Sequence, residues 1–176
     1  VQATIPGKDT FIGELDGTIT DRVKAIGSAF EEAGMHCIVS DNIMGVIWDK
    51  LLVNVATGAV CGITHLPYGD MYQEDKLVAT AVAAVQEGMD VAAKAGVKLT
   101  YSDPMDVLEL ARAGLPYDFK PSILQSLEKH RPTEVGVING AVVAQGAKHG
   151  VATPVNETLV ACVTGIERYI REYINK

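Results

Sequence analysis

The stretch NIMGVIWDKLLVNVA, residues 42–56, decides the fold expected for this chain. Apolar residues occupy ten of these fifteen positions, so we expect a helix over these residues to have almost no polar face. Such a pattern is typical of a helix that is buried on all sides. Asp41, directly before the stretch, is a residue type favoured at a helix N-cap. We therefore expect a buried helix that belongs to a helical domain.

Beyond this stretch the chain is expected to be helical almost throughout. Asp103-Pro104 and Thr153-Pro154 each place proline at the first position of a helix, where its missing N–H does no harm. Ser122, followed three residues later by Gln125, fits a capping box. Further helices are expected over residues 74–95 and 132–149, and Gly58 and Gly62 predict a break after the first helix.

The first forty residues have a different pattern. Short β-branched stretches at Val1–Ile5 and Phe11–Leu15 predict strands. Helical spacing follows from Thr20 to Gly34, and His36–Val39 predicts another strand. These few strands and one helix are too small a part of an α/β layer to bury their apolar side chains by themselves. Because the chain also lacks an initiator Met, we expect it to be a piece of a longer protein.

Composition excludes several classes of function. The 176 residues are 48% apolar and 21% charged, as in an ordinary globular domain. A net charge of −7, without a block of Lys or Arg, argues against binding of nucleic acid or of a membrane surface. No uninterrupted apolar run predicts a membrane span, and no signal peptide is apparent. Three cysteines without a CxxC motif predict reduced thiols and a cytoplasmic location.

Four residues are candidates for chemistry. Lys50 and Asn54 are four positions apart, so they share one face of the apolar helix. This Lys50 either lines a cleft, where burial and neighbouring acids tune its pKa, or extends its ammonium group to water. Glu134 is expected in the first turn of a helix, where the macrodipole stabilises any acid. Ser122 is accounted for as an N-cap. GxGxxG, GxSxG and metal-binding spacings are absent, and no metal is expected.

Four motifs in order resemble one family: WDKLLVN (48–54), PSILQSL (121–127), RPTEVGVINGAVV (131–143) and GVATPVNETL (150–159). They are similar to the C-terminal half of ketopantoate reductase, also called 2-dehydropantoate 2-reductase. TFIGELDG (10–17) resembles the end of that family's nucleotide-binding domain. The resemblance covers essentially the whole chain.

The resemblance implies a mainly α fold. Residues 41–176 would be an all-helical substrate-binding and catalytic domain, similar to the C-terminal domain of 6-phosphogluconate dehydrogenase. Residues 1–40 would be the C-terminal remnant of a nucleotide-binding Rossmann domain. The family reduces 2-dehydropantoate to pantoate with NADPH, on the route to pantothenate and coenzyme A. The isolated piece would be inactive, because its nucleotide site would lie upstream.

The resemblance also implies roles for the four candidates. Lys50 matches the catalytic lysine, which protonates the substrate ketone as hydride arrives. Glu134 matches a glutamate that contacts substrate and cofactor near the lysine, so that both residues would touch NADP. Asn54 and Ser122 match substrate-binding residues, with Ser122 holding the carboxylate at a helix N-terminus. The four side chains are expected to converge on one cleft.

Two departures from the family pattern leave alternatives open. Gly58 stands where well-studied members carry a second asparagine, and Phe119 replaces another polar contact. A pocket with fewer hydrogen-bonding groups discriminates less for a hydroxylated substrate. A paralogue that reduces another 2-oxo acid is one alternative, as is a neighbouring dehydrogenase with an unrelated substrate. A helical dimerisation or interaction module without catalysis is another. The expected partner is a small 2-oxo acid, and a homodimer stays open.

Overall fold

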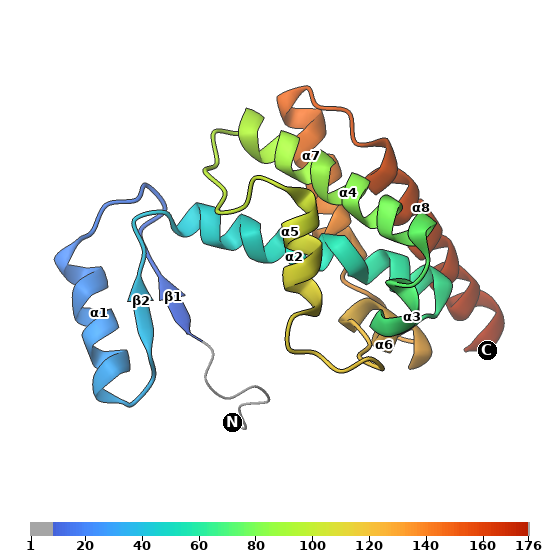
Figure 1. The fold of residues 1–176 in the computed structure, drawn as a ribbon, viewed down its shortest axis with the longest axis horizontal. Coiled ribbons are helices and arrows are strands. Elements are labelled where there is room, and N and C mark those ends of the chain that lie inside the picture. The colour runs from blue at the N-terminus through green and yellow to red at the C-terminus, as the bar shows by residue number, and fades with distance from the viewer. Residues whose placement is uncertain (1–8, 176) are drawn as a thin grey trace. The chain divides into compact units, whose positions relative to one another are not determined.

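The computed structural model describes residues 9–175 and divides into two compact units, Val1–Trp48 and Asp49–Lys176 (Figure 1). The division falls inside one long helix, α2 (Ile43–Thr64).

The first unit contains a strand–helix–strand arrangement. Strands β1 (Thr10–Ile12) and β2 (Cys37–Val39) pair in parallel, and helix α1 (Asp21–Glu32) connects them. Thr20 caps α1 by accepting a hydrogen bond from the Val23 N–H at 3.2 Å. The strands and helix expected between residues 10 and 39 are thus confirmed, whereas the strand expected at Val1–Ile5 lies outside the described residues.

Helix α2 is longer than the sequence predicts, because the expected break at its glycines does not occur. Gly58 and Gly62 lie inside the helix and face α6 (Ser122–Glu128). A Cβ atom at Gly62 would lie 2.7 Å from Cγ2 of Ile123, and one at Gly58 would lie 3.1 Å from its Cδ1. The glycines therefore allow two helices to approach closely instead of ending one of them. The helix ends before His65, which has a positive φ of 58°.

The same helix is long and apolar enough to cross a membrane, by length and composition alone. The sequence analysis found no such span because Asp49 and Lys50 interrupt the apolar run. Leu52, Val55 and Ala56 have no exposed surface, and 56% of the apolar window is buried inside the protein. Contact with neighbouring helices thus accounts for the apolar character of the second half of α2. Ile47, in the first half, is 49% exposed, so the expectation that the helix is buried on all sides is wrong for these residues.

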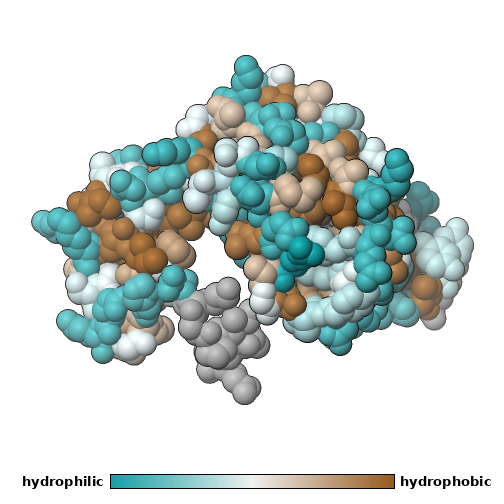
Figure 2. All heavy atoms as spheres, viewed as in Figure 1, coloured by the Kyte–Doolittle hydropathy of each residue, from teal (hydrophilic) through white to brown (hydrophobic). Residues whose placement is uncertain are grey.

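Further helices build the second unit. They are α3 (Tyr68–Met71), α4 (Asp75–Lys94), α5 (Pro104–Arg112), α6, the 3₁₀ turn η1 (Val135–Val137), α7 (Asn139–His149), α8 (Pro154–Tyr169) and the π-helical turn η2 (Ile170–Ile174). Helices α4, α7 and α8 pack against one another (Figure 1). Gly88 brings α4 close to Leu52 of α2, since a Cβ atom there would lie 2.5 Å from Cδ2 of that leucine. Polar residues cover much of the visible face of this unit (Figure 2).

Among the other expected helix boundaries, the one at α5 is confirmed and two are wrong. Asp103 caps α5, because its carboxylate accepts from the Met105 N–H at 2.8 Å. The capping box at Ser122 is wrong, since Pro121 stands at the N-cap and Ser122 is already helical. The single helix expected over 132–149 is also wrong. The chain first forms η1, and α7 begins only at Asn139.

Candidate functional site

One face of α2 carries Lys50, Asn54 and Gly58, each four residues after the last. Lys50 is exposed, Asn54 is half-buried and Gly58 is fully covered, so the face runs from solvent into the core. In the described part of the chain Lys50 has no ion pair and no side-chain hydrogen bond. The shared face that the spacing predicts is therefore present, and the ammonium group at its open end extends to water.

Helix α6 brings Ser122 toward the same face. Its second residue, Ile123, touches Gly58, one helical turn beyond Asn54. Ser122 itself is exposed at the first position of α6. The packing of α6 on the glycines of α2 therefore places Ser122 near the inner end of the Lys50–Asn54 face.

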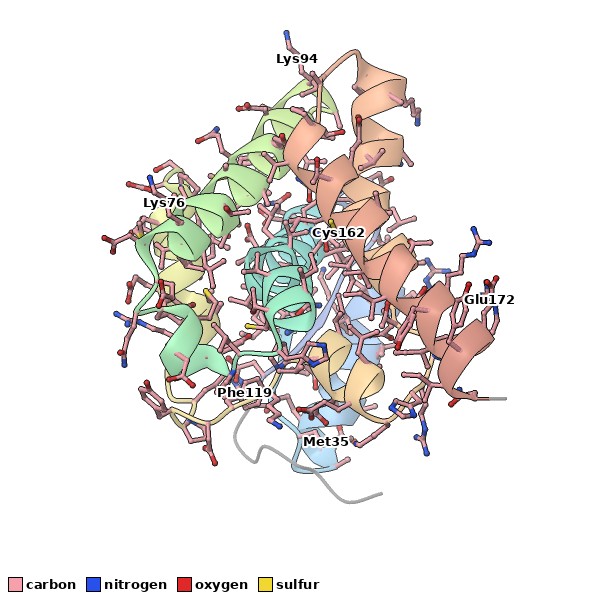
Figure 3. The ribbon with its side chains drawn as sticks, turned by 90° about the vertical axis from the view of Figure 1, so that its right-hand side faces the viewer. Met35, Lys76, Lys94, Phe119, Cys162 and Glu172 are labelled. Atoms are coloured by element: carbon pink, nitrogen blue, oxygen red, sulfur yellow. The ribbon has the colours of Figure 1, made fainter. Side chains whose placement is uncertain are left out.

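Phe119 lies in the connection that enters α6 (Figure 3). Its ring packs edge-on against Tyr68, with the ring centres 5.0 Å apart, and its carbonyl accepts from the Tyr68 N–H at 3.0 Å. The hydroxyl of Tyr68 pairs with Thr57 of α2 at 2.7 Å in the interior. Burial raises the pKa of Tyr68. Through its contact with Tyr68, Phe119 thus connects the segment before α6 to α3 and α2.

Glu134 lies on a turn that is held by other helices. It is exposed and precedes η1, so the helical first turn expected for it is not present. Its carbonyl accepts from the N–H groups of Val137 and Ile138, each at 3.0 Å. The structure shows no ion pair between Glu134 and Lys50, and both side chains are exposed. Of the two alternatives for Lys50, the described residues therefore show the second, an ammonium group that extends to water. Convergence of Glu134 with the other three candidates stays a prediction.

A buried polar chain was missed by the sequence analysis. Asn139 and Asn156 have no exposed surface and hydrogen-bond to each other, and Asn156 also bonds to Glu87. Both asparagines stand in motifs that were singled out, RPTEVGVINGAVV and GVATPVNETL, so the motifs carried a signal. The sequence around Glu87 gave no such signal, because Glu87 is one acid within a long amphipathic helix.

No group of three His, Cys, Asp or Glu side chains that could hold a metal ion occurs within residues 9–175.

These features define a class of protein: a helical domain whose long apolar helix carries an exposed lysine and, one turn further on, a half-buried asparagine. The family described as "Ketopantoate reductase PanE/ApbA C terminal" matches residues 42–167. The chain belongs to the ketopantoate reductase family, and the match covers its helical domain, as the four motifs indicated.

Individual relatives agree with this assignment. The 2-dehydropantoate 2-reductase of Archaeoglobus fulgidus is 31% identical over 158 residues, which are 90% of this chain and 52% of that protein. The crystal structure of a PanE/ApbA family ketopantoate reductase from Ralstonia eutropha JMP134 is 28% identical, with a TM-score of 0.81 over 93% of this chain and 53% of the other. The chain spans about half the length of the curated relatives it matches.

A third likeness is to a different enzyme. The ternary structure of D-mandelate dehydrogenase with NADH and anilino(oxo)acetate is 25% identical to this chain. Its TM-score is 0.78, and the match covers 93% of this chain and 88% of that one. The same fold therefore occurs in a protein that was solved with NADH and anilino(oxo)acetate.

Proposed function

We propose that the helical unit is the substrate-binding and catalytic domain of an NADPH-dependent reductase that converts 2-dehydropantoate to pantoate. The observation that carries this proposal is the face of α2, where the ammonium group of Lys50, which pairs with no acid among residues 9–175, lies one turn from Asn54, with Ser122 on the adjoining helix. A cation without such a partner is free to bind an electron-rich group of a substrate. A 2-oxo acid has two such groups, the ketone oxygen and the carboxylate.

The four candidate side chains have complementary roles in this proposal. Lys50 donates a hydrogen bond to the ketone oxygen and then its proton, which stabilises the charge that develops there. Asn54 binds the substrate on the neighbouring turn, and the hydroxyl of Ser122 donates to the carboxylate. Glu134 contacts substrate and cofactor. NADPH supplies the hydride, and this chain would touch it through Lys50 and Glu134.

The first unit supports a nucleotide-binding origin for residues 1–40. Its parallel strands, joined by one helix, are the connection on which Rossmann domains are built. We propose that residues 1–40 are the end of such a domain and that residues 41–176 form the substrate domain. The structural division falls later than this proposed boundary, at Trp48.

The residues at positions 58 and 119 also favour a second candidate substrate, a 2-oxo acid with an apolar side chain. Gly58 provides no hydrogen-bonding group and is covered by Ile123, and Phe119 packs against Tyr68. A site with few polar groups gives little preference for a substrate hydroxyl. The likeness to D-mandelate dehydrogenase supports this alternative within the same reaction class.

Three further proposals concern the setting of the reaction. The cysteines Cys37, Cys61 and Cys162 are all free, which supports a reducing, cytoplasmic location. The partner is proposed to be a small 2-oxo acid. Pairing into a homodimer is proposed from the behaviour of two-domain enzymes of this class, and sedimentation of the complete protein tests it.

The proposed function is tested by steady-state oxidation of NADPH by the complete protein that contains these residues. The substrates to compare are 2-dehydropantoate, 3-methyl-2-oxobutanoate, which lacks its hydroxymethyl group, and benzoylformate. The highest kcat/KM with 2-dehydropantoate supports the first candidate, and a higher value with either apolar acid supports the second. No oxidation of NADPH or NADH with any of the three overturns both and leaves the interaction module.

A further inference from the structure

The turn that carries Glu134 is fastened to α8 just before that residue. The backbone N–H of Thr133 donates a hydrogen bond to Oε1 of Glu167 at 2.6 Å. A charged acceptor makes this bond stronger than one between neutral groups. The hydroxyl oxygen of Thr133 accepts in turn from the Val135 N–H at 3.2 Å. Glu167 therefore holds the residue before Glu134, and Thr133 holds the residue after it.

The same turn is fastened to α8 again where α7 begins. Asn139 donates from Nδ2 to Oδ1 of Asn156 at 2.9 Å, and both side chains are fully buried. Asn156 donates from its own Nδ2 to the Ala84 carbonyl at 2.9 Å and to Oε2 of Glu87 at 2.7 Å. Glu87 also accepts the backbone N–H groups of Val155 and Asn156 at the start of α8, where the helix macrodipole favours a carboxylate.

The direction of every bond in this chain follows from its charged end. A carboxylate only accepts, so Asn156 must turn its amide nitrogen toward Glu87 and its oxygen toward Asn139. Asn139 must then donate, and its own Oδ1 is left buried without a partner among the described residues. A buried acceptor without a partner destabilises the folded state. An apolar pair would avoid that cost, so stability alone does not account for two buried asparagines here.

Both anchors lie on one face of α8. Asn156 and Glu167 are eleven positions apart, which is about three turns and about 16 Å along the helix. Cys162 marks the middle of α8 in Figure 3. Between the anchors the turn buries Val135 and Ile138, which are 3% and 6% exposed. The backbone of Glu134 is thus fixed on both sides, while its carboxylate remains exposed.

We propose that Glu167 and the Asn139–Asn156 pair are positioning residues, which hold the turn so that the Glu134 carboxylate stays where the reaction uses it. This inference rests on the proposed function of Glu134. Neither Glu167 nor the asparagines need to touch the substrate, since they act through the backbone on either side of Glu134.

A double-mutant cycle in the complete protein tests the proposal through Glu134 itself. Glu167→Leu removes the acceptor and is expected to lower kcat at least about tenfold, with KM changed less than about threefold. Glu167→Gln keeps an acceptor oxygen without the charge and is expected to restore at least about half of the wild-type kcat. In a Glu134→Gln background, Glu167→Leu is expected to lower kcat less than about threefold, because the group it positions is already gone. An equal loss in both backgrounds overturns the positioning role.

Hydrogen–deuterium exchange provides a readout that does not depend on activity. The amides of Thr133 and Val135 are expected to exchange at least about tenfold faster in Glu167→Leu than in the wild type or in Glu167→Gln. Asn139→Ala, at the second anchor, is expected to speed exchange across the same turn. Unchanged exchange in both variants overturns the proposal. Faster exchange in a protein that reduces no 2-oxo acid would support the anchoring and would overturn the proposed function alone.

Discussion

The close approach of α2 and α6 predicts an unusual response to a glycine-to-alanine substitution. In a helix interior, alanine is favoured over glycine by about 1 kcal/mol. At Gly62, however, the new Cβ atom would lie 2.7 Å from Cγ2 of Ile123 and 3.3 Å from Cδ1 of Leu127. The Cγ2 atom is attached directly to the Cβ of a β-branched residue, so it cannot move away without a change of rotamer or a shift of α6. Overpacking of this kind costs about 1–3 kcal/mol.

The matched control is Gly165 of α8, which also lies inside a helix but has no atom within 4 Å of an added Cβ. Gly165→Ala is expected to stabilise the protein by about 0.5–1 kcal/mol. Gly62→Ala gains the same propensity and pays the overpacking, so its net effect is a destabilisation of about 0–2 kcal/mol. The two variants should therefore differ by about 1–3 kcal/mol in the free energy of unfolding.

Urea unfolding followed by circular dichroism measures this difference. Ile123→Leu moves the branch away from Cβ and so removes the atom nearest Gly62, and it is expected to recover much of the loss in a Gly62→Ala background. If Gly62→Ala stabilises the protein as much as Gly165→Ala does, the helices do not approach at that glycine, and the placement of Ser122 next to the face of α2 is refuted as well.

Two further predictions concern titration and reactivity. The hydrogen bond and the charge of Asp9 raise the pKa of His36, with Nδ1 and Oδ1 2.8 Å apart. The stability that this pair adds is therefore present below the unfolded-state pKa of the histidine, near 6.5, and is lost as pH rises through the higher folded-state value. Titration by NMR should show the raised pKa in the wild type and its return toward 6.5 in Asp9→Asn; equal values in both would contradict the pairing. Burial raises the pKa of the Cys61 thiol to about 12, so at pH 8 this thiol should react far more slowly with iodoacetamide than the exposed Cys162. Mass spectrometry of the native protein measures both rates, and labelling of Cys61 as fast as Cys162 would contradict its burial.

Features that depend on neighbouring residues could be predicted from the sequence. The spacing of Lys50 and Asn54 was sufficient to place them on one face of α2. Asp103 is the N-cap residue and Pro104 the first residue of α5, and both are residue types favoured at those positions. The beginning of α5 was therefore also predictable. In each case the interacting groups are separated by a few residues, and helix geometry alone relates them.

Features that depend on distant residues were not predictable. Gly58 has the local pattern of a helix end, and only the presence of Ile123 on another helix explains why the helix continues. Ser122 fits a capping box by sequence, but Gln125 instead donates to the carbonyl of Lys120 at 2.7 Å. Glu87 meets Asn156 across 69 positions, a pairing that no local pattern indicates.

The candidate site divides in the same way. The motif around Lys50 indicated the correct helix and face, while the proximity of Glu134 to Lys50 depends on tertiary structure and stays a prediction, since the described residues show no ion pair between the two. Hydrogen bonds of Glu167 and Asn139 instead hold the turn that carries Glu134.

The central claim is that the ammonium group of Lys50 protonates the substrate carbonyl. Single-turnover oxidation of NADPH by the complete protein, at saturating 2-oxo acid, tests it most directly. Lys76 on α4 is an equally exposed lysine and provides the control (Figure 3). Lys50→Ala is expected to slow hydride transfer by about 10²–10⁴, whereas Lys76→Ala should stay within about twofold of the wild type. A Lys50→Ala rate within about threefold of the wild type would contradict the claim.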